Sequence, residues 1–129
     1  MEHTQHNPRS ITAPIGNYSH GIEVNPGCRY LFISGQIPEL PNGSAPTSFE
    51  EQCHAVWDNI FAVLASANMQ PKHLVKVTTF LTHADQVAAN SQIRQTRLGN
   101  VQPAITVVIV QTLESKWLLE IEAIAAATP

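Results

Sequence analysis

The chain has 129 residues and a mass of 14.1 kDa, which fits one domain and leaves little room for two. Seven Lys and Arg against ten Asp and Glu give a formal net charge of −3, and no basic run offers a surface to nucleic acid. No apolar segment is long enough to span a bilayer, and the first residues lack the pattern of a signal peptide. We therefore expect one cytoplasmic domain over residues 1–129, with neither nucleic acid nor membrane as a partner.

The first part of the chain is predicted to form an extended lead-in over residues 1–14 and then a β-hairpin. Strands are expected from Tyr18 to Val24 and from Arg29 to Ser34, because Asn25-Pro26-Gly27 between them has strong turn chemistry. Residues 38–47 contain three prolines, which exclude a strand and indicate a loop.

The clearest predicted element is a helix that begins after the loop. Ser48 and Glu51 have the spacing of a capping box, and Asn68 and Pro71 mark the end of the helix. Between them, apolar residues recur at steps of three and four and define one apolar face: Cys53, Val56, Trp57, Ile60, Val63, Leu64 and Ala67.

The second half of the chain alternates strands and one more helix. A strand is expected from Leu74 to Leu81 and a helix over residues 84–98 that Gly99 ends. Two further strands follow, from Ala104 to Gln111 and from Trp117 to Ala125. The order β-β-α-β-α-β-β predicts an α+β fold with a mixed sheet of five or six strands and two helices on one face.

Two strands in this pattern are apolar on both faces, although two helices can cover only one face. In the strand that starts at Ala104, the apolar residues Ile105 and Val107 point one way and Val108 points the other way. A strand that is buried on both faces needs a second cover. With only 13% charged residues, the cover is expected to be another copy of the chain.

Polar residues that could carry chemistry are few. Glu120 and Glu122 alternate with apolar residues, so both carboxylates are expected on the sheet face opposite the helices. Partial burial there beside a like charge would suit proton transfer, whereas at the rim of an interface the carboxylates would simply reach solvent. Gly35, after Ser34, permits close approach of a ligand to the backbone but serves equally to end a strand.

The histidines and cysteines do not form a pattern typical of a metal site. The six histidines are scattered, no pair has i,i+4 spacing, and no pair of cysteines supports them. Cys28 lies beside a turn and Cys53 on the apolar face of the first helix, so both are interpreted as structural thiols. We therefore expect no metal and no cofactor.

A resemblance to one family covers residues 14 to 126, nearly the whole chain. Five ordered blocks carry it: Gly16-Asn17-Tyr18-Ser19-His20, Ile33-Ser34-Gly35-Gln36-Ile37-Pro38, Val75-Lys76-Val77-Thr78-Thr79-Phe80-Leu81-Thr82, Pro103-Ala104, and Glu120-Ile121-Glu122-Ala123-Ile124-Ala125. In these blocks the chain resembles the RidA/YjgF family of reactive intermediate deaminases. The resemblance implies a chorismate-mutase-like fold, a homotrimer and three clefts between subunits.

The resemblance also implies an activity and a set of site residues. Members of the family hydrolyse reactive imines and enamines without metal or cofactor, and a glutamate and the backbone of a strand position the attacking water. In this chain the matching glutamate is Glu120 and the matching strand covers residues 105–107. Tyr18, Ser34 and Asn90 match further cleft residues, and the hydroxyls of Tyr18 and Ser34 are suited to donate hydrogen bonds to substrate.

The chain departs from the family at the position that binds the substrate carboxylate. Deaminating members have an arginine there, but this chain has Ile105, followed by Thr106 and Val107. Loss of a bidentate arginine would weaken carboxylate binding by roughly 2 kcal/mol or more. The usual 2-imino acids are therefore not the expected substrates, unless Arg94 or Arg97 on the second helix replaces the missing cation. Alternatively, both arginines reach solvent or pair with an acid across the interface between copies.

Three functions remain open from the sequence. The first is hydrolysis of an imine or enamine other than the usual 2-imino acids, and the second is a non-enzymatic, metabolite-binding or chaperone-like trimer, which Ile105 supports. The third, an endoribonuclease, is the least supported because an RNA cleft needs cations and stacking aromatics, and aromatic residues make up only 6% of this chain.

Overall fold

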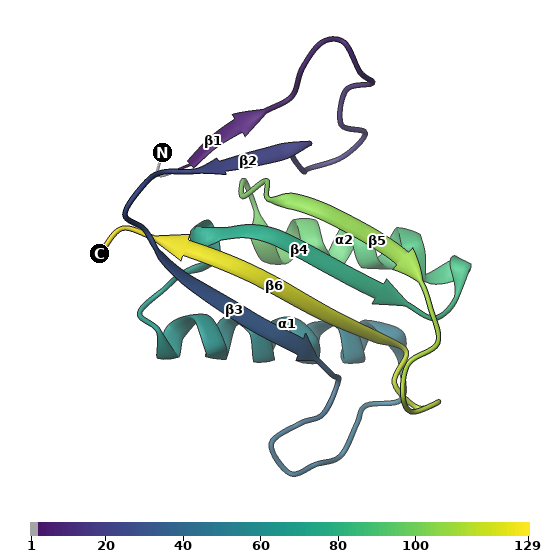
Figure 1. Ribbon diagram of the computed structural model, residues 1–129. Coiled ribbons are helices and arrows are strands. Elements are labelled where there is room, and N and C mark those ends of the chain that lie inside the picture. The colour runs from purple at the N-terminus through teal and green to yellow at the C-terminus, as the bar shows by residue number, and fades with distance from the viewer. Residues whose placement is uncertain (1–2) are drawn as a thin grey trace.

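The computed structural model describes residues 3–129 (Figure 1). In chain order, its elements are β1 (His3–His6), β2 (Gly21–Val24), β3 (Arg29–Gln36), α1 (Phe49–Ser66), a 3-10 turn (Pro71–His73), β4 (Leu74–Leu81), a second 3-10 turn (Ala84–Gln86), α2 (Val87–Leu98), β5 (Ala104–Ile109) and β6 (Leu119–Ala127). The predicted α+β fold is confirmed, with an additional strand, β1, inside the segment that was expected to be a plain lead-in.

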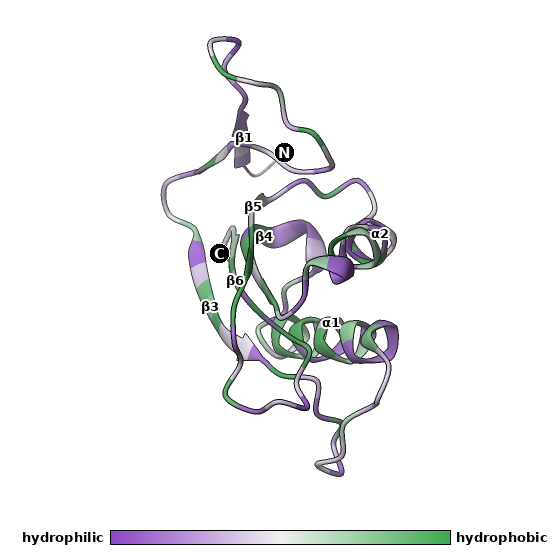
Figure 2. Cartoon of the chain, turned by 90° about the vertical axis from the view of Figure 1, so that its right-hand side faces the viewer, coloured by the Kyte–Doolittle hydropathy of each residue, from purple (hydrophilic) through white to green (hydrophobic). Residues whose placement is uncertain are grey.

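The main sheet has four strands in the order β3-β6-β4-β5. β6 is antiparallel to both of its neighbours, whereas β4 and β5 are parallel and are joined through α2. Both helices cover the same face of this sheet (Figures 1 and 2). The sheet is therefore mixed with helices on one face, as predicted, but it is narrower than the five or six strands expected.

α1 forms where the sequence predicts it, because its start is capped and one face is apolar. The Ser48 hydroxyl accepts a hydrogen bond from the Glu51 backbone N–H at 3.2 Å and donates one to the Glu51 carboxylate at 3.0 Å. Trp57, Ile60 and Leu64 on the apolar face are fully buried against the sheet. The residues of the sheet that meet the helices alternate along the strands, and in β6 they include the small side chains of Ala123, Ala125 and Ala127.

The second half also follows the prediction, with small shifts at strand ends. β4 spans the predicted residues, while β5 ends two residues earlier and β6 begins and ends two residues later than expected. α2 ends at Leu98, and Gly99 takes φ +59° and donates its N–H to the Gln95 carbonyl at 2.9 Å. Glycine tolerates this backbone conformation without strain, which explains the end of the helix.

The predicted hairpin between residues 18–24 and 29–34 is wrong. β2 pairs with β1 in a separate two-stranded sheet, and β3 pairs with β6 in the main sheet. The turn at Gly27 forms as expected, with φ +81°, but it redirects the chain instead of pairing its two flanks. Contacts with the far end of the sequence hold β1 and β2: His3 bonds the Ala126 carbonyl at 2.8 Å and Gln5 bonds Gln102 at 3.2 Å.

The sheet face opposite the helices is open and partly apolar. Phe32 is 73% exposed and Tyr30 is 55% exposed on β3, and their rings stack with centroids 6.3 Å apart. On β5, Val108 lies on this face and is 40% exposed in the single chain. This is the surface that the two-sided strands predicted, and its cover by another copy stays a prediction.

Within residues 3–129, no helix has the length and apolar character needed to cross a membrane.

Candidate functional site

The carboxylate of Glu120 packs directly against the backbone of Gly35 on the open face of the sheet. A Cβ atom added at Gly35 would lie 2.8 Å from Glu120 Cδ and 3.1 Å from Cγ, closer than side chains pack. This close approach occurs where the pairing of β3 with β6 shifts register between Ile33 and Gln36. Gly35 therefore does more than end a strand, because only a residue without a side chain leaves room for Glu120.

Ser34, the residue before Gly35, lines a shallow pocket that Glu122, and not Glu120, helps to form. The pocket has a volume of about 250 Å³, and its polar lining residues are Ser34, Lys76, Thr78 and Glu122. Glu120 is half-buried and Glu122 is exposed in the single chain. The structure thus confirms that both carboxylates lie on the face opposite the helices, together with the Ser34 hydroxyl.

Lys76 is a site residue that the sequence analysis missed. Its ammonium donates a hydrogen bond to the Thr106 hydroxyl at 2.7 Å across the β4–β5 pair. The sequence did contain a signal for Lys76, because strand alternation places this lysine on the same face of β4 as Thr78. Lys76 places one positive charge on a face that also carries Glu120 and Glu122.

The three predicted residues on β5 do not share one surface. Thr106 lies on the open face with Lys76, while Ile105 lies on the helix side and packs against the core. Val107 is 36% exposed. In the described part of the chain, the edge of β5 away from β4 is bridged only where Ser19 pairs with Ala104. The backbone at 105–107 is therefore available on that edge.

Tyr18 is fixed beside the start of β5. Its neighbour Ser19 is buried and donates two hydrogen bonds, from N–H to the Pro103 carbonyl at 3.1 Å and from Oγ to the Gln102 carbonyl at 2.7 Å. The Tyr18 hydroxyl accepts a hydrogen bond from the Ile15 N–H at 3.4 Å, and its ring meets His20 edge-on.

Asn90 and Arg94 lie one turn apart on α2 and are both buried. Asn90 is 0% exposed, and neither its amide oxygen nor its amide nitrogen has a hydrogen-bond partner in the described residues. Arg94 is 8% exposed, and within residues 3–129 it forms no hydrogen bond or ion pair. Burial lowers the pKa of Arg94 from its ordinary value, while the proximity of Cys53 and Tyr18 partly opposes this change.

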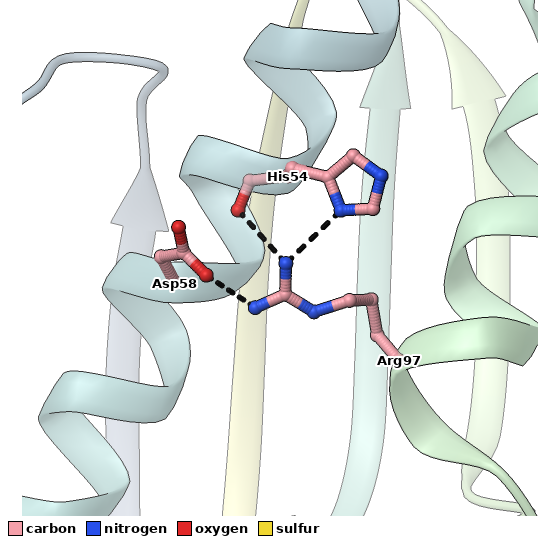
Figure 3. A network of polar contacts seen from close by, with 3 residues as sticks. All are labelled: His54, Asp58 and Arg97. Atoms are coloured by element: carbon pink, nitrogen blue, oxygen red, sulfur yellow. Dashed lines mark hydrogen bonds and ion pairs between the residues drawn. The ribbon is translucent and has the colours of Figure 1, made fainter.

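Arg97, one turn further along α2, has the opposite environment (Figure 3). Its guanidinium bonds the Asp58 carboxylate and His54 Nδ1, the latter at 3.0 Å, and lies 5.1 Å from the centre of the Phe61 ring. These contacts tie α2 to α1. The acid that pairs with Arg97 belongs to its own chain and not to another copy across an interface, and pairing of Arg94 with an acid of another copy stays a prediction.

Burial also affects a thiol close to Arg94. Cys53 on α1 is fully buried, and burial raises the pKa of its thiol from 9.0 to about 12, against the opposing charges of Arg97 and Arg94. A thiol with this pKa stays protonated at neutral pH, which agrees with a structural role. In the described residues, no three His, Cys, Asp or Glu side chains gather as they would around a metal ion.

The site residues predicted from the sequence therefore form two groups on opposite sides of the sheet. Ser34, Thr106 and Glu120 lie on the open face, whereas Asn90 lies on the helix side, and Tyr18 is within electrostatic range of the helix-side Arg94. A larger cavity of about 910 Å³ lies between β1, β2 and the start of β4, but neither group lines it.

The family described as Endoribonuclease L-PSP matches residues 9–127. The chain belongs to this family. This is the RidA/YjgF family indicated by the five sequence blocks, and the match covers the whole of the main sheet and both helices.

Relatives and solved structures in the family agree in extent and fold. The chain is 34% identical over 114 residues to a RutC family protein of Pyrococcus horikoshii, covering 87% of this chain and 88% of the relative. It is 30% identical over 115 residues to TdcF of Escherichia coli K12, named as a reactive intermediate deaminase, covering 86% and 87%. The Rid-family protein YyfB of Yersinia pestis superimposes with a TM-score of 0.87 at 28% identity, covering 98% of this chain and all of the other.

Proposed function

We propose that this chain hydrolyses reactive imines or enamines, releasing ammonia and a carbonyl product, in a cleft formed between copies of the chain. The observation that carries the proposal is the Glu120 carboxylate held against Gly35, next to the Ser34 hydroxyl on an open, partly apolar face. The membership of the RidA/YjgF family and the name of its relative TdcF support the same chemistry.

The proposed reaction needs one base and hydrogen-bond donors. Water attacks the imine carbon while Glu120 accepts a proton from that water, which forms a C–O bond and a tetrahedral carbinolamine. Glu120 returns this proton to the nitrogen. The carbinolamine hydroxyl then gives up its own proton, which Glu120 also passes to the nitrogen, so that the C–N bond breaks and ammonia leaves as the carbonyl forms. The hydroxyls of Ser34 and Tyr18 and the free backbone edge at residues 105–107 are suited to orient the substrate and the water.

The two groups of site residues explain why the proposal needs more than one copy. Glu120 and Ser34 lie on the open face, while Tyr18 lies by the start of β5 and Asn90 lies on the helix side. A cleft that uses both groups forms when the open face of one copy meets the β5 edge of the next copy. We propose a homotrimer, the assembly that the resemblance to the RidA/YjgF family implies. A head-to-tail ring of this kind has one cleft at each junction and covers Phe32 and Tyr30.

RNA cleavage, which the family name Endoribonuclease L-PSP suggests, has weaker support in this chain. On the open face, the two carboxylates of Glu120 and Glu122 outnumber the single ammonium of Lys76 among the described residues. A face of this charge repels phosphate instead of binding it.

The two cysteines are free thiols, which fits a reducing compartment, and we propose that the protein works in the cytoplasm.

The test is the decay of imines that an amino-acid oxidase generates in the same solution, measured with and without the protein. Wild-type protein should accelerate the decay, and Glu120→Gln should abolish the acceleration because the amide cannot accept a proton. Glu122→Gln is the matched control, since it changes the same charge two residues away on the same face. If Glu120→Gln keeps activity within a few-fold of wild type, or if no imine responds to the wild type, the proposed function is wrong.

A further inference from the structure

Arg94 presents an unusual combination of charge and burial. Arg94 is only 8% exposed, yet no carboxylate in residues 3–129 pairs with its guanidinium. A buried guanidinium without a partner is unfavourable, because the charge loses its hydration and gains no hydrogen bond in return. Arg97 on the same helix shows that the fold can supply an acid where it uses an arginine for structure.

Asn90 provides a second unsatisfied group on the same face of α2. Residues at i and i+4 of a helix are neighbours, so the Asn90 amide and the Arg94 guanidinium line one stripe. The amide oxygen and nitrogen of Asn90 are both enclosed and have no hydrogen-bond partner in the described residues. The guanidinium nitrogens of Arg94 also lack a partner there, but they are not fully enclosed. The guanidinium therefore keeps a path to solvent, and the amide is the next polar group that a ligand entering past Arg94 would meet.

The position of this pair links it to the proposed cleft. Arg94 lies within electrostatic range of Tyr18, which is fixed beside the backbone edge of β5. The position at which relatives bind the substrate carboxylate holds Ile105 here, whose side chain packs against the core. The cation nearest along the helix, Arg97, is already occupied by Asp58 and His54.

We infer that Arg94 and Asn90 form an anion site that holds the carboxylate of the substrate from the helix side. The site carries one positive charge and one neutral amide, which matches a carboxylate monoanion and would leave a phosphate dianion undercompensated. A carboxylate accepts two hydrogen bonds from the guanidinium and one from the Asn90 amide nitrogen, so one ligand pairs with the donors of both residues, while the Asn90 amide oxygen needs a separate donor. The inference rests on the proposed function and narrows its substrates to carboxylate-bearing imines.

The first experiment measures binding without turnover. Pyruvate, a 2-oxo acid that cannot be hydrolysed further, is titrated by calorimetry into wild type, Arg94→Met, Arg94→Lys and the control Arg9→Gln, which removes an exposed cation. Methyl pyruvate serves as the uncharged ligand. We expect wild type and Arg9→Gln to bind pyruvate in preference to its ester, Arg94→Met to bind at least about 10-fold more weakly, and Arg94→Lys to lie between them. Equal binding by wild type and Arg94→Met, or no preference for the acid over the ester, would overturn the inference.

The second experiment separates a ligand site from a structural arginine. Without ligand, Arg94→Met should unfold at the same temperature as wild type or above it, because an apolar side chain replaces an unpaired buried charge. If instead the variant melts lower, or its oligomer dissociates on dilution, Arg94 pairs with an acid of a neighbouring copy and the inference is wrong. Glu120→Gln should still bind pyruvate, so a failure of hydrolysis alone would leave the anion site intact.

Discussion

The two faces of the four-stranded sheet differ in how completely the rest of the single chain covers them. On the helix face, Trp57, Ile60 and Leu64 of α1 are fully buried, so apolar packing there is complete. On the open face, Phe32 is 73% exposed and lines the same shallow pocket as Glu122. The helix face therefore holds the chain together, whereas the open face carries apolar and charged groups that the single chain leaves uncovered.

The largest effect that separates the faces should come from the core. Trp57→Ala is expected to lower the free energy of unfolding by about 4 kcal/mol, because it leaves a cavity under α1. Phe32→Ala is the matched control on the open face. It should leave the fold of the chain intact but shift the oligomer towards monomer in sedimentation experiments at low concentration. A Phe32→Ala variant that unfolds as readily as Trp57→Ala would remove the distinction between the two faces.

Adjacent residues of β5 offer a sharper version of the same comparison. Ile105→Arg should lower the free energy of unfolding by about 3 kcal/mol, because Ile105 packs against the core and Arg94 already places an unpaired cation on the helix side. Thr106→Arg, one residue along on the open face, should fold normally. Chemical denaturation of both variants measures the difference.

Ile105→Arg should hydrolyse 2-imino acids no faster than wild type, because Arg94 already supplies the cation for the carboxylate. If the variant folded stably and hydrolysed them much faster than wild type, the family arginine alone would be missing and the role assigned to Arg94 would be contradicted.

On the open face, the fit between Gly35 and Glu120 predicts a loss of activity with a smaller loss of stability. Gly35→Ala places a methyl group where the Glu120 carboxylate lies, with Cδ only 2.8 Å away, so the carboxylate must move. We expect hydrolysis to fall about 100-fold, which is a typical contribution of a positioned base. In Gly21→Ala the nearest atom would lie at an ordinary 3.7 Å, so this control should keep its activity. Unchanged turnover in Gly35→Ala would show that the position of Glu120 does not matter.

The smallest predicted effect concerns the two thiols. Cys53 is fully buried with a pKa raised from 9.0 to about 12, whereas Cys28 is partly exposed. At pH 8, alkylation should modify Cys28 in the folded protein and spare Cys53 until the chain unfolds.

The same pKa shift predicts a loss of stability in alkaline solution. Since the folded state keeps the Cys53 proton longer than the unfolded state does, the stabilisation present below pH 9 is lost as the pH rises from 9 towards 12. Cys53→Ala should remove this component of the alkaline loss. Rapid alkylation of Cys53 in the folded protein would contradict its burial.

The sequence predicted those features that local chemistry determines. The capping box at Ser48, the apolar face of α1, the bounds of β4 and the alternation that places Glu120 on the open face are all set by neighbouring residues.

The features that the sequence missed depend on contacts between distant segments. The turn at Gly27 predicts a change of direction, but it does not determine which strand pairs with β2. That pairing depends on contacts of β1 with Gln102 and Ala126, far along the chain. The sequence likewise places Ser34 at the end of a strand and Asn90 on a helix, but it does not show that they lie on opposite sides of the sheet. The absence of a partner for Arg94 within the described chain became visible only once the neighbouring side chains were placed.

The central claim, that one cleft uses the two groups of residues from different copies, is tested most directly by mixing two impaired variants. Glu120→Gln removes the base on the open face, and Tyr18→Phe removes the hydroxyl beside β5. When equal amounts are unfolded together and reassembled, about a quarter of the junctions in a ring contain both native residues. The account predicts that imine hydrolysis recovers to about a quarter of the wild-type rate in the mixture, above the rates of the separate variants. No recovery in mixed oligomers would show that each site lies within one chain and would contradict the account.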